Sequence, residues 1–133
     1  IKSKLLEDTP SPRIIIVGGS NIAWGIDSAR IEMEIGLPTI NDGLDLHLGV
    51  TPLLELKKNI KKGDIIVVSL EYYNFASPND FFGISQYQAD WIEFSPERIM
   101  YLPHPYQDAL PMLNLILQRK VNRQLTPFYT MPI

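Results

Sequence analysis

The segment Arg13-Ile14-Ile15-Ile16-Val17-Gly18-Gly19-Ser20-Asn21 decides the fold that we expect for this chain. Its four consecutive β-branched residues, with no polar residue between them, predict a buried strand over 13–17. Two glycines then end the strand and put Ser20 just beyond it. Ligands of open α/β sheets bind at the carboxyl ends of the strands, so Ser20 is the first candidate for a functional residue.

Two further strands are expected along the chain: a short one at 38–42, around Thr39-Ile40, and one at 64–70, which is rich in β-branched residues. Helices are predicted between them. The first, 28–35, has Asp27 or Ser28 as its cap and ends at Gly36, and the second, 51–62, starts at Thr51-Pro52. Strands of continuous hydrophobicity that alternate with helices predict a three-layer α/β/α domain with a parallel sheet and right-handed crossovers.

The remaining segments give weaker patterns. Residues 1–12 are polar and contain Pro10 and Pro12, so we expect a lead-in or linker, followed by one partial α/β domain over 13–133. Residues 71–94 are rich in aromatic side chains and predict a long loop or lid with a short helix. Another short helix is expected from Ser95. Leu110, Leu113, Leu117, Val121 and Leu125 then indicate a helix over about 106–125 despite Pro111, before an extended tail over 126–133.

Composition excludes several classes of protein and site. A chain of 133 residues with 45% hydrophobic content has material for one core. The net charge is −3, and the paired lysines Lys57-Lys58 and Lys61-Lys62 fall near a predicted helix end, so nucleic acid is not an expected partner. The chain has no cysteine, so a disulfide or a thiolate metal site is excluded. No His or carboxylate residues have the spacing of metal ligands. No apolar run reaches the roughly 18 residues of a membrane span.

Residues 14–75 resemble the first half of the SGNH/GDSL hydrolase superfamily, particularly its surface-polysaccharide and teichoic-acid modification branches. Val17-Gly18-Gly19-Ser20-Asn21 is similar to the block that carries the nucleophile, so the resemblance implies that role for Ser20. Asn41-Asp42-Gly43-Leu44 is similar to the second block, which implies that the N–H groups of Gly43 and Ser20 stabilise the oxyanion. Such donors are worth about 10²–10³ in rate each.

The third block departs from the superfamily pattern of Gly-x-Asn-Asp. Here the third strand runs into Ser69-Leu70-Glu71-Tyr72-Tyr73-Asn74, so Asn74 is the candidate for a further oxyanion donor. Glu71 lies where the strand emerges into the cleft, and we expect it to contact substrate. Asn21 and Trp24, close to the nucleophile, are expected to contact substrate as well.

The base is missing from its usual place, an Asp-x-x-His pair near the C-terminus. Neither histidine, His47 or His104, has an aspartate three residues before it. A serine hydroxyl without a base is a weak nucleophile, so the resemblance implies a base beyond Ile133 and a truncated flavodoxin-like domain that is inactive alone. Because the first residue is Ile1 rather than Met, we also expect that an upstream segment has been removed.

The function implied is that of a serine-dependent acyl-ester hydrolase or O-acyltransferase. Its expected substrate is an acylated glycan or a similar small ester, in the bacterial cell envelope outside the cytoplasm, with no cofactor. A homo-oligomer that covers an exposed sheet edge is a further expectation.

Three alternatives remain open. In a dinucleotide-binding domain, Gly18-x-Ser20-x-x-Ala23 would be a degraded G-x-G-x-x-G and Asp42 the ribose-binding acid. Against this alternative, we expect Trp24-Gly25-Ile26 to delay the helix. A P-loop is excluded, because no Gly-Lys-Ser/Thr follows. In a non-catalytic carbohydrate-binding relative, aromatic residues stack on sugars, with Trp24, Tyr87 and Trp91 as candidates. In the third alternative, the site has no catalytic function, and Ser20 and Asn21 only cap the turn that follows the first strand.

Overall fold

The structure is a computed structural model that describes residues 2–76 and 83–125. Its centre is a parallel sheet of β1 (Ile14–Gly18), β2 (Thr39–Gly43) and β3 (Ile65–Ser69), in the order β2-β1-β3. Ile14 pairs with Thr39 on one side and Ile65 on the other. The three expected strands are therefore confirmed within about a residue, and their order is that of the first three strands of a flavodoxin-like sheet.

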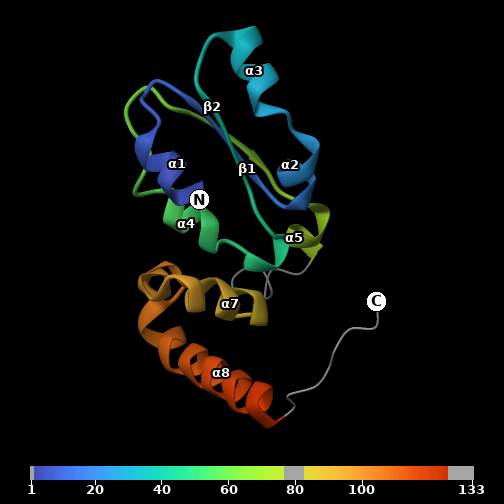
Figure 1. Cartoon of the computed structure of the whole chain (residues 1–133), viewed down its shortest axis with the longest axis vertical. Helices are drawn as coiled ribbons and strands as arrows, with labels where there is room; N and C mark the ends of the chain where they lie inside the picture. Colours follow the sequence, from blue (N-terminus) through green and yellow to red (C-terminus); the bar gives the residue numbers. More distant parts are fainter. Residues whose placement is uncertain (1, 77–82, 126–133) are drawn as a thin grey trace.

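Helices cover both faces of this sheet (Figure 1). On one face, α2 (Ser20–Gly25) and α3 (Ser28–Ile35) lie over a core cluster of Ile14, Ile16 and Ile22. On the other face, α1 (Lys2–Asp8) and α4 (Thr51–Leu56) complete a cluster with Ile15, Val17 and Ile40. Because alternate β1 residues face opposite layers, the unbroken apolar run is explained and the three-layer α/β fold is confirmed.

Helix α3 has the predicted ends. The Asp27 side chain accepts a hydrogen bond from the Arg30 N–H at 3.1 Å, and Gly36 ends the helix in the left-handed region at φ 76°. Helix α4 is shorter than predicted and ends at Leu56. Thr51 does not cap it. Its side chain is fully buried and accepts a hydrogen bond from the Gln88 side chain at 2.8 Å.

The predicted linker over residues 1–12 is wrong for residues 2–8, which form helix α1. Leu6 is only 3% exposed and belongs to the core cluster of α4 and β1. Two adjacent leucines, Leu5 and Leu6, among polar residues carry too little periodicity to predict a helix, so the tertiary contact decides the structure here.

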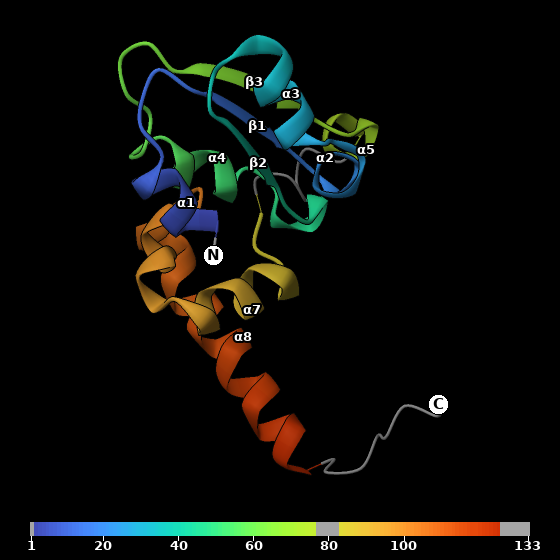
Figure 2. The ribbon, with the colours of Figure 1, turned by 45° about the horizontal axis from the view of Figure 1, so that its top comes forward.

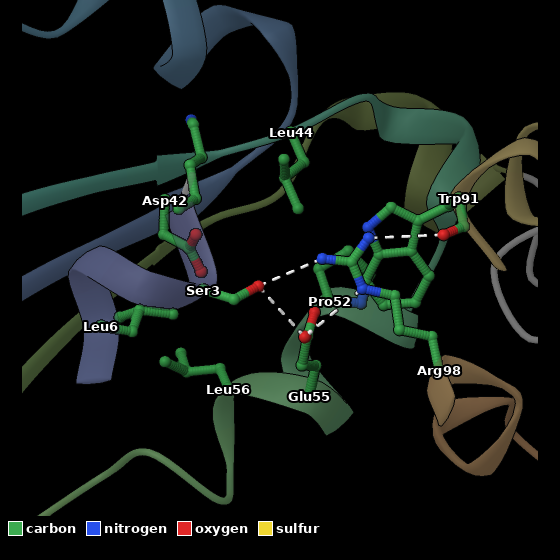
Figure 3. Close-up of a pocket in the computed structure, with 10 residues that line it drawn as sticks. Ser3, Leu6, Asp42, Leu44, Pro52, Glu55, Leu56, Trp91 and Arg98 are labelled. Carbon is green, nitrogen blue, oxygen red and sulfur yellow. Dashed lines mark hydrogen bonds and ion pairs between the residues drawn. The ribbon is translucent and has the colours of Figure 1, made fainter. Parts of the chain in front are cut away.

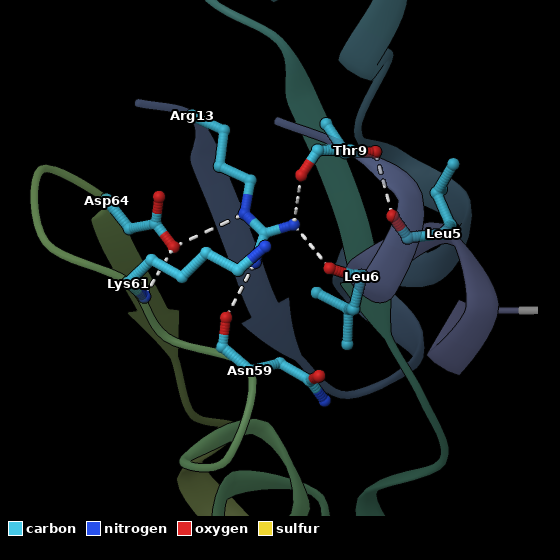
Figure 4. Close-up of polar contacts among 7 residues, drawn as sticks. All are labelled: Leu5, Leu6, Thr9, Arg13, Asn59, Lys61 and Asp64. Carbon is cyan, nitrogen blue, oxygen red and sulfur yellow. Dashed lines mark hydrogen bonds and ion pairs between the residues drawn. The ribbon is translucent and has the colours of Figure 1, made fainter. Parts of the chain in front are cut away.

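Arg13, immediately before β1, ties α1 to the rest of the sheet (Figure 4). Its fully buried guanidinium donates to the backbone carbonyls of Leu6, Thr9 and Asn59. It also forms an ion pair with Asp64 at 3.3 Å, in which both side chains are 0% exposed. A buried charge needs such partners. Through them, Arg13 holds the segment that precedes β1 against the segment that precedes β3.

The C-terminal part is helical. It contains α5 (Tyr72–Ala76), α7 (Gln86–Phe94), the 3-10 helix η2 (Pro96–Tyr101) and α8 (Pro105–Leu125), and a shorter 3-10 helix, η1 (Leu46–Leu48), lies between β2 and α4. The segment 71–94, predicted as a long loop with one short helix, therefore contains two helices, α5 and α7, and the second was not predicted. A capping box between Ser85 and Gln88 starts α7, and Ala89, Ile92 and Met112 lie in its core with α8. Phe81, Phe82 and the expected tail over 126–133 lie outside the described residues.

Two apolar surfaces are exposed. On β3, which is an edge strand, Ile65, Val67 and Val68 are 45–49% exposed. On α8, four residues of the stripe that predicted the helix are exposed, namely Leu110, Leu113, Leu117 and Val121, while Met112 and Ile116 are buried against α7. Figure 2 shows α8 extending away from the sheet. Across residues 2–76 and 83–125, we find no helix with the length and hydrophobicity of a membrane span.

Candidate functional site

Ser20 is the first residue of α2, directly after the end of β1. The expectation that Trp24-Gly25-Ile26 delays the helix is therefore wrong. The early start depends on Gly18, because a Cβ there would lie 2.5 Å from both the Ile22 side chain and the Ser69 carbonyl oxygen. The absent side chain lets α2 pack on the end of the strand and leaves the Ser20 side chain exposed at the carboxyl edge of the sheet.

Ser20 and Gly43 line one hollow of about 430 Å³, which we call the Ser20 hollow. Trp24 and Asp45 also line it, and Trp24 is 90% exposed. The structure thus brings together residues from the first and second blocks of the resemblance, together with one expected substrate contact.

Gly43 is required by packing. A Cβ at this position would lie 2.3 Å from the Ala23 backbone nitrogen, so no other residue fits without a shift of α2. The Gly43 N–H, the expected oxyanion donor, donates to the Asn41 Oδ1 at 3.0 Å. The Gly43 carbonyl accepts from the Lys2 ammonium. An oxyanion would therefore have to take the place of the Asn41 side chain.

The third strand also delivers a side chain to Ser20. The Ser20 Oγ donates a hydrogen bond to Glu71 Oε1 at 3.4 Å. Glu71 is held in turn, because its N–H donates to the Asn74 Oδ1 at 2.9 Å. The Asn74 side chain was expected to stabilise the oxyanion. It is largely buried, and its oxygen accepts this hydrogen bond from the residue that precedes α5.

Asn21 has a local role. Its Oδ1 accepts a hydrogen bond from the Ile22 N–H at 2.8 Å, and the residue is exposed. Asn21 is the second residue of α2, whose N-cap is Gly19, so this contact with the next N–H is local and does not cap the helix.

The two histidines differ in their surroundings. His47 Nδ1 lies 2.6 Å from Asp45 Oδ1, and its ring stacks on Tyr87 with centroids 4.4 Å apart. Asp45 lines the Ser20 hollow, so one member of this pair reaches it. The Asp-x-x-His pattern could not indicate this pair, because the aspartate stands two residues before the histidine rather than three. His104 lies before α8, where its N–H donates to Asp108.

A second cavity, of about 310 Å³, lies on the α1–α4 face of β2 (Figure 3), and we call it the Asp42 cavity. Its polar lining is Asp42, Lys2, Ser3, Glu55 and Arg98. Burial raises the pKa of Asp42 to about 6, an effect that Lys2 opposes and Glu55 reinforces. Burial lowers the pKa of Lys2, partly offset by Asp42. The sequence could not indicate this cavity, because Lys2 and Ser3 belonged to the expected linker.

Protein-family models, curated proteins and solved structures were compared with the chain. None of them matches it. The function is therefore argued from the geometry of the site and from the resemblance of its short motifs.

The geometry does not favour a dinucleotide site. Asp42 faces α1 and α4 and lines the Asp42 cavity, whereas α2 lies on the opposite face of the sheet. The turn at Gly18–Ser20 and the supposed ribose-binding acid thus belong to different hollows. Among the residues that the structure describes, no three His, Asp or Glu side chains form a group that could hold a metal ion.

Proposed function

We propose that the chain carries the nucleophile of a serine-dependent acyl-ester hydrolase or O-acyltransferase of the SGNH type. One observation supports this most directly: an exposed serine at the carboxyl end of β1 contacts a carboxylate from the end of β3, beside a glycine from the end of β2. Three strands thus contribute to one place, as expected for a site at the edge of a parallel sheet.

In the proposed reaction, the Ser20 Oγ attacks the carbonyl carbon of the ester. The carbon–oxygen bond to the alcohol then breaks, the proton from Ser20 passes through a base to the leaving oxygen, and the acyl group stays on Ser20. Water or a second hydroxyl takes up the acyl group in the next step, with the proton returned to Ser20. The Ser20 N–H, and the Gly43 N–H once Asn41 is displaced, would stabilise the oxyanion.

Glu71 is proposed as a positioning residue that fixes the Ser20 hydroxyl, and Asn74 as the residue that fixes Glu71. Trp24 offers an exposed aromatic face to the substrate beside the nucleophile. An acylated glycan of the bacterial envelope remains the proposed substrate, and the resemblance implies a histidine as the base.

Selective modification of Ser20 tests the proposal. The purified chain is incubated with a fluorophosphonate, with and without imidazole as an exogenous base, and the labelled peptide is identified by mass spectrometry. We expect Ser20 to be labelled ahead of the other serines and imidazole to accelerate the labelling. Ser20→Ala should abolish it, whereas the control Ser28→Ala, at the start of α3, should leave it unchanged.

Two outcomes would count against the proposal. One is labelling spread over several serines at rates that do not depend on imidazole. The other is unchanged total labelling in Ser20→Ala. Either result would mean that the hydroxyl of Ser20 is not activated and that its role is local, as a residue at the start of α2.

A further inference from the structure

The Asp42 cavity adjoins the Ser20 hollow. Lys2 and Leu44 line both, so a molecule bound in one lies close to the other. With about 310 Å³ it is at the lower end of the roughly 300–1,000 Å³ typical of ligand sites, which suits a single ring rather than a chain of several.

The polar groups of the cavity balance in charge. Lys2 and Arg98 contribute two cations and Asp42 and Glu55 two carboxylates. Arg98 lies 3.5 Å from Glu55 and donates to the Ser3 Oγ at 3.1 Å (Figure 3). An ionised ligand would meet as many like charges as opposite ones. A neutral ligand with several hydroxyl groups can instead donate to the carboxylates and accept from the cations.

The rest of the lining is apolar. Leu6, Leu44, Pro52 and Leu56 form it, together with the indole of Trp91, over which the Arg98 guanidinium lies at 4.3 Å. The ligand that fits such a site has a face of C–H groups for these side chains and an edge of hydroxyls for the charged ones. A pyranose ring has both.

We infer that the Asp42 cavity binds one neutral sugar residue, with Asp42 as its principal hydrogen-bond acceptor. Asp42 is only 4% exposed, and the fold retains this carboxylate although its burial disfavours the charged form. A buried polar group kept at such a cost is typical of binding sites. The inference rests on the proposed function in one respect: the sugar would be the part of the glycan next to the ester.

Two tryptophans make the test direct, because the chain has only Trp24 and Trp91. Trp91 lines the Asp42 cavity and Trp24 the Ser20 hollow. The indole N–H signals of the ¹⁵N-labelled chain report on each hollow separately, and Trp24→Phe assigns them. The probes are the methyl pyranosides of glucose, galactose, mannose and N-acetylglucosamine, with n-butylammonium and butyrate as ionic competitors.

We expect at least one pyranoside to shift the Trp91 signal along a saturating curve, with a millimolar dissociation constant. Asp42→Asn, which keeps the shape of the side chain, should weaken this binding at least fivefold. The matched control Asp45→Asn changes a carboxylate that lines the Ser20 hollow and should leave the affinity within twofold.

The inference is overturned if no pyranoside shifts the Trp91 signal, if Asp42→Asn binds as tightly as the parent chain, or if either ion binds more tightly than every sugar. Ser20→Ala should retain sugar binding. A chain whose Ser20 is not labelled but whose Trp91 still responds to a sugar would therefore refute the proposed function and leave the sugar site intact.

Discussion

The Ser20 hydroxyl donates a hydrogen bond to the Glu71 carboxylate across 3.4 Å, and this pair joins the ends of two neighbouring parallel strands. Glu71 can reach Ser20 because its backbone N–H is fixed by the Asn74 side chain at the start of α5. The sequence suggested substrate contact for Glu71 and oxyanion binding for Asn74. In the structure these two residues form a chain of contacts that ends at the proposed nucleophile.

Glu71→Gln should slow fluorophosphonate labelling of Ser20 by about three- to tenfold. A hydrogen bond to a charged group is worth about 1.5–3 kcal/mol, and the length of this one and the exposure of Ser20 reduce that value. The measurement is the pseudo-first-order labelling rate. Glu34→Gln, which changes an exposed carboxylate on α3, is the control and should label at the parent rate. An unchanged rate in Glu71→Gln would remove Glu71 from the mechanism.

The sequence predicted best where local signals and burial agree. The run from Ile14 to Val17 is buried on both faces because the helical layers lie on both sides of β1. Asp27 and Gly36 set the ends of α3 through backbone chemistry that needs no partner elsewhere. The proximity of Ser20 to Gly43 followed from parallel strands alone, because their carboxyl ends share one edge.

Features that depend on distant partners could not be predicted. Helix α1 depends on the packing of Leu6 against β1 and α4, and on Arg13, which also bonds to Asn59 far along the chain. Helix α7 packs on α8 through Ala89 and Ile92. These two residues lie in an aromatic-rich segment whose sequence has no clear helical periodicity. The Asp42 cavity needs both helices, so it could not be seen before they were placed.

Arg13→Ala should lower the free energy of unfolding by about 3–5 kcal/mol. The substitution leaves the Asp64 carboxylate buried without its cation and leaves three backbone carbonyls without their donor. Urea denaturation followed by circular dichroism measures the change.

Arg30→Ala is the matched control for Arg13. It removes an ion pair with Glu34 in which the side chains are 72% and 61% exposed, so about 0.5 kcal/mol or less should be lost. Similar losses in both variants would show that the Arg13–Asp64 pair does not hold α1 against the sheet.

Gly43→Ala should destabilise the chain by about 1–3 kcal/mol or more, because its methyl group would overlap the Ala23 backbone, which cannot rotate away. Gly25→Ala, where no atom lies within 4 Å of the new methyl group, should change stability by about 1 kcal/mol at most and favours the helix. The comparison uses the same denaturation measurement. Equal stability of the two variants would mean that α2 does not pack on β2 as closely as described.

Asp42→Asn should make the chain more stable at pH 7 and leave it unchanged near pH 4. The folded chain raises the pKa of Asp42 from its ordinary value of 3.8 to about 6, so the folded state binds the proton more tightly than the unfolded state. The free energy of unfolding therefore falls as the pH rises from 4 to 7, by about 3 kcal/mol from this group, at 1.36 kcal/mol per pH unit between the two pKa values. Asparagine cannot ionise and removes this dependence.

Unfolding curves at pH 4, 5, 6 and 7 measure the effect as the difference between Asp42→Asn and the parent chain, because titration of the other carboxyls cancels in that difference. Lys2→Met should have the opposite effect to Asp42→Asn, because Lys2 is the cation that lowers the pKa of Asp42. Without Lys2, the free energy of unfolding should fall more steeply above pH 5. A difference that stays flat from pH 4 to 7 would show that Asp42 ionises as freely in the folded chain as in the unfolded one. The carboxylate would then be open to water, contrary to the burial on which the proposed sugar site rests.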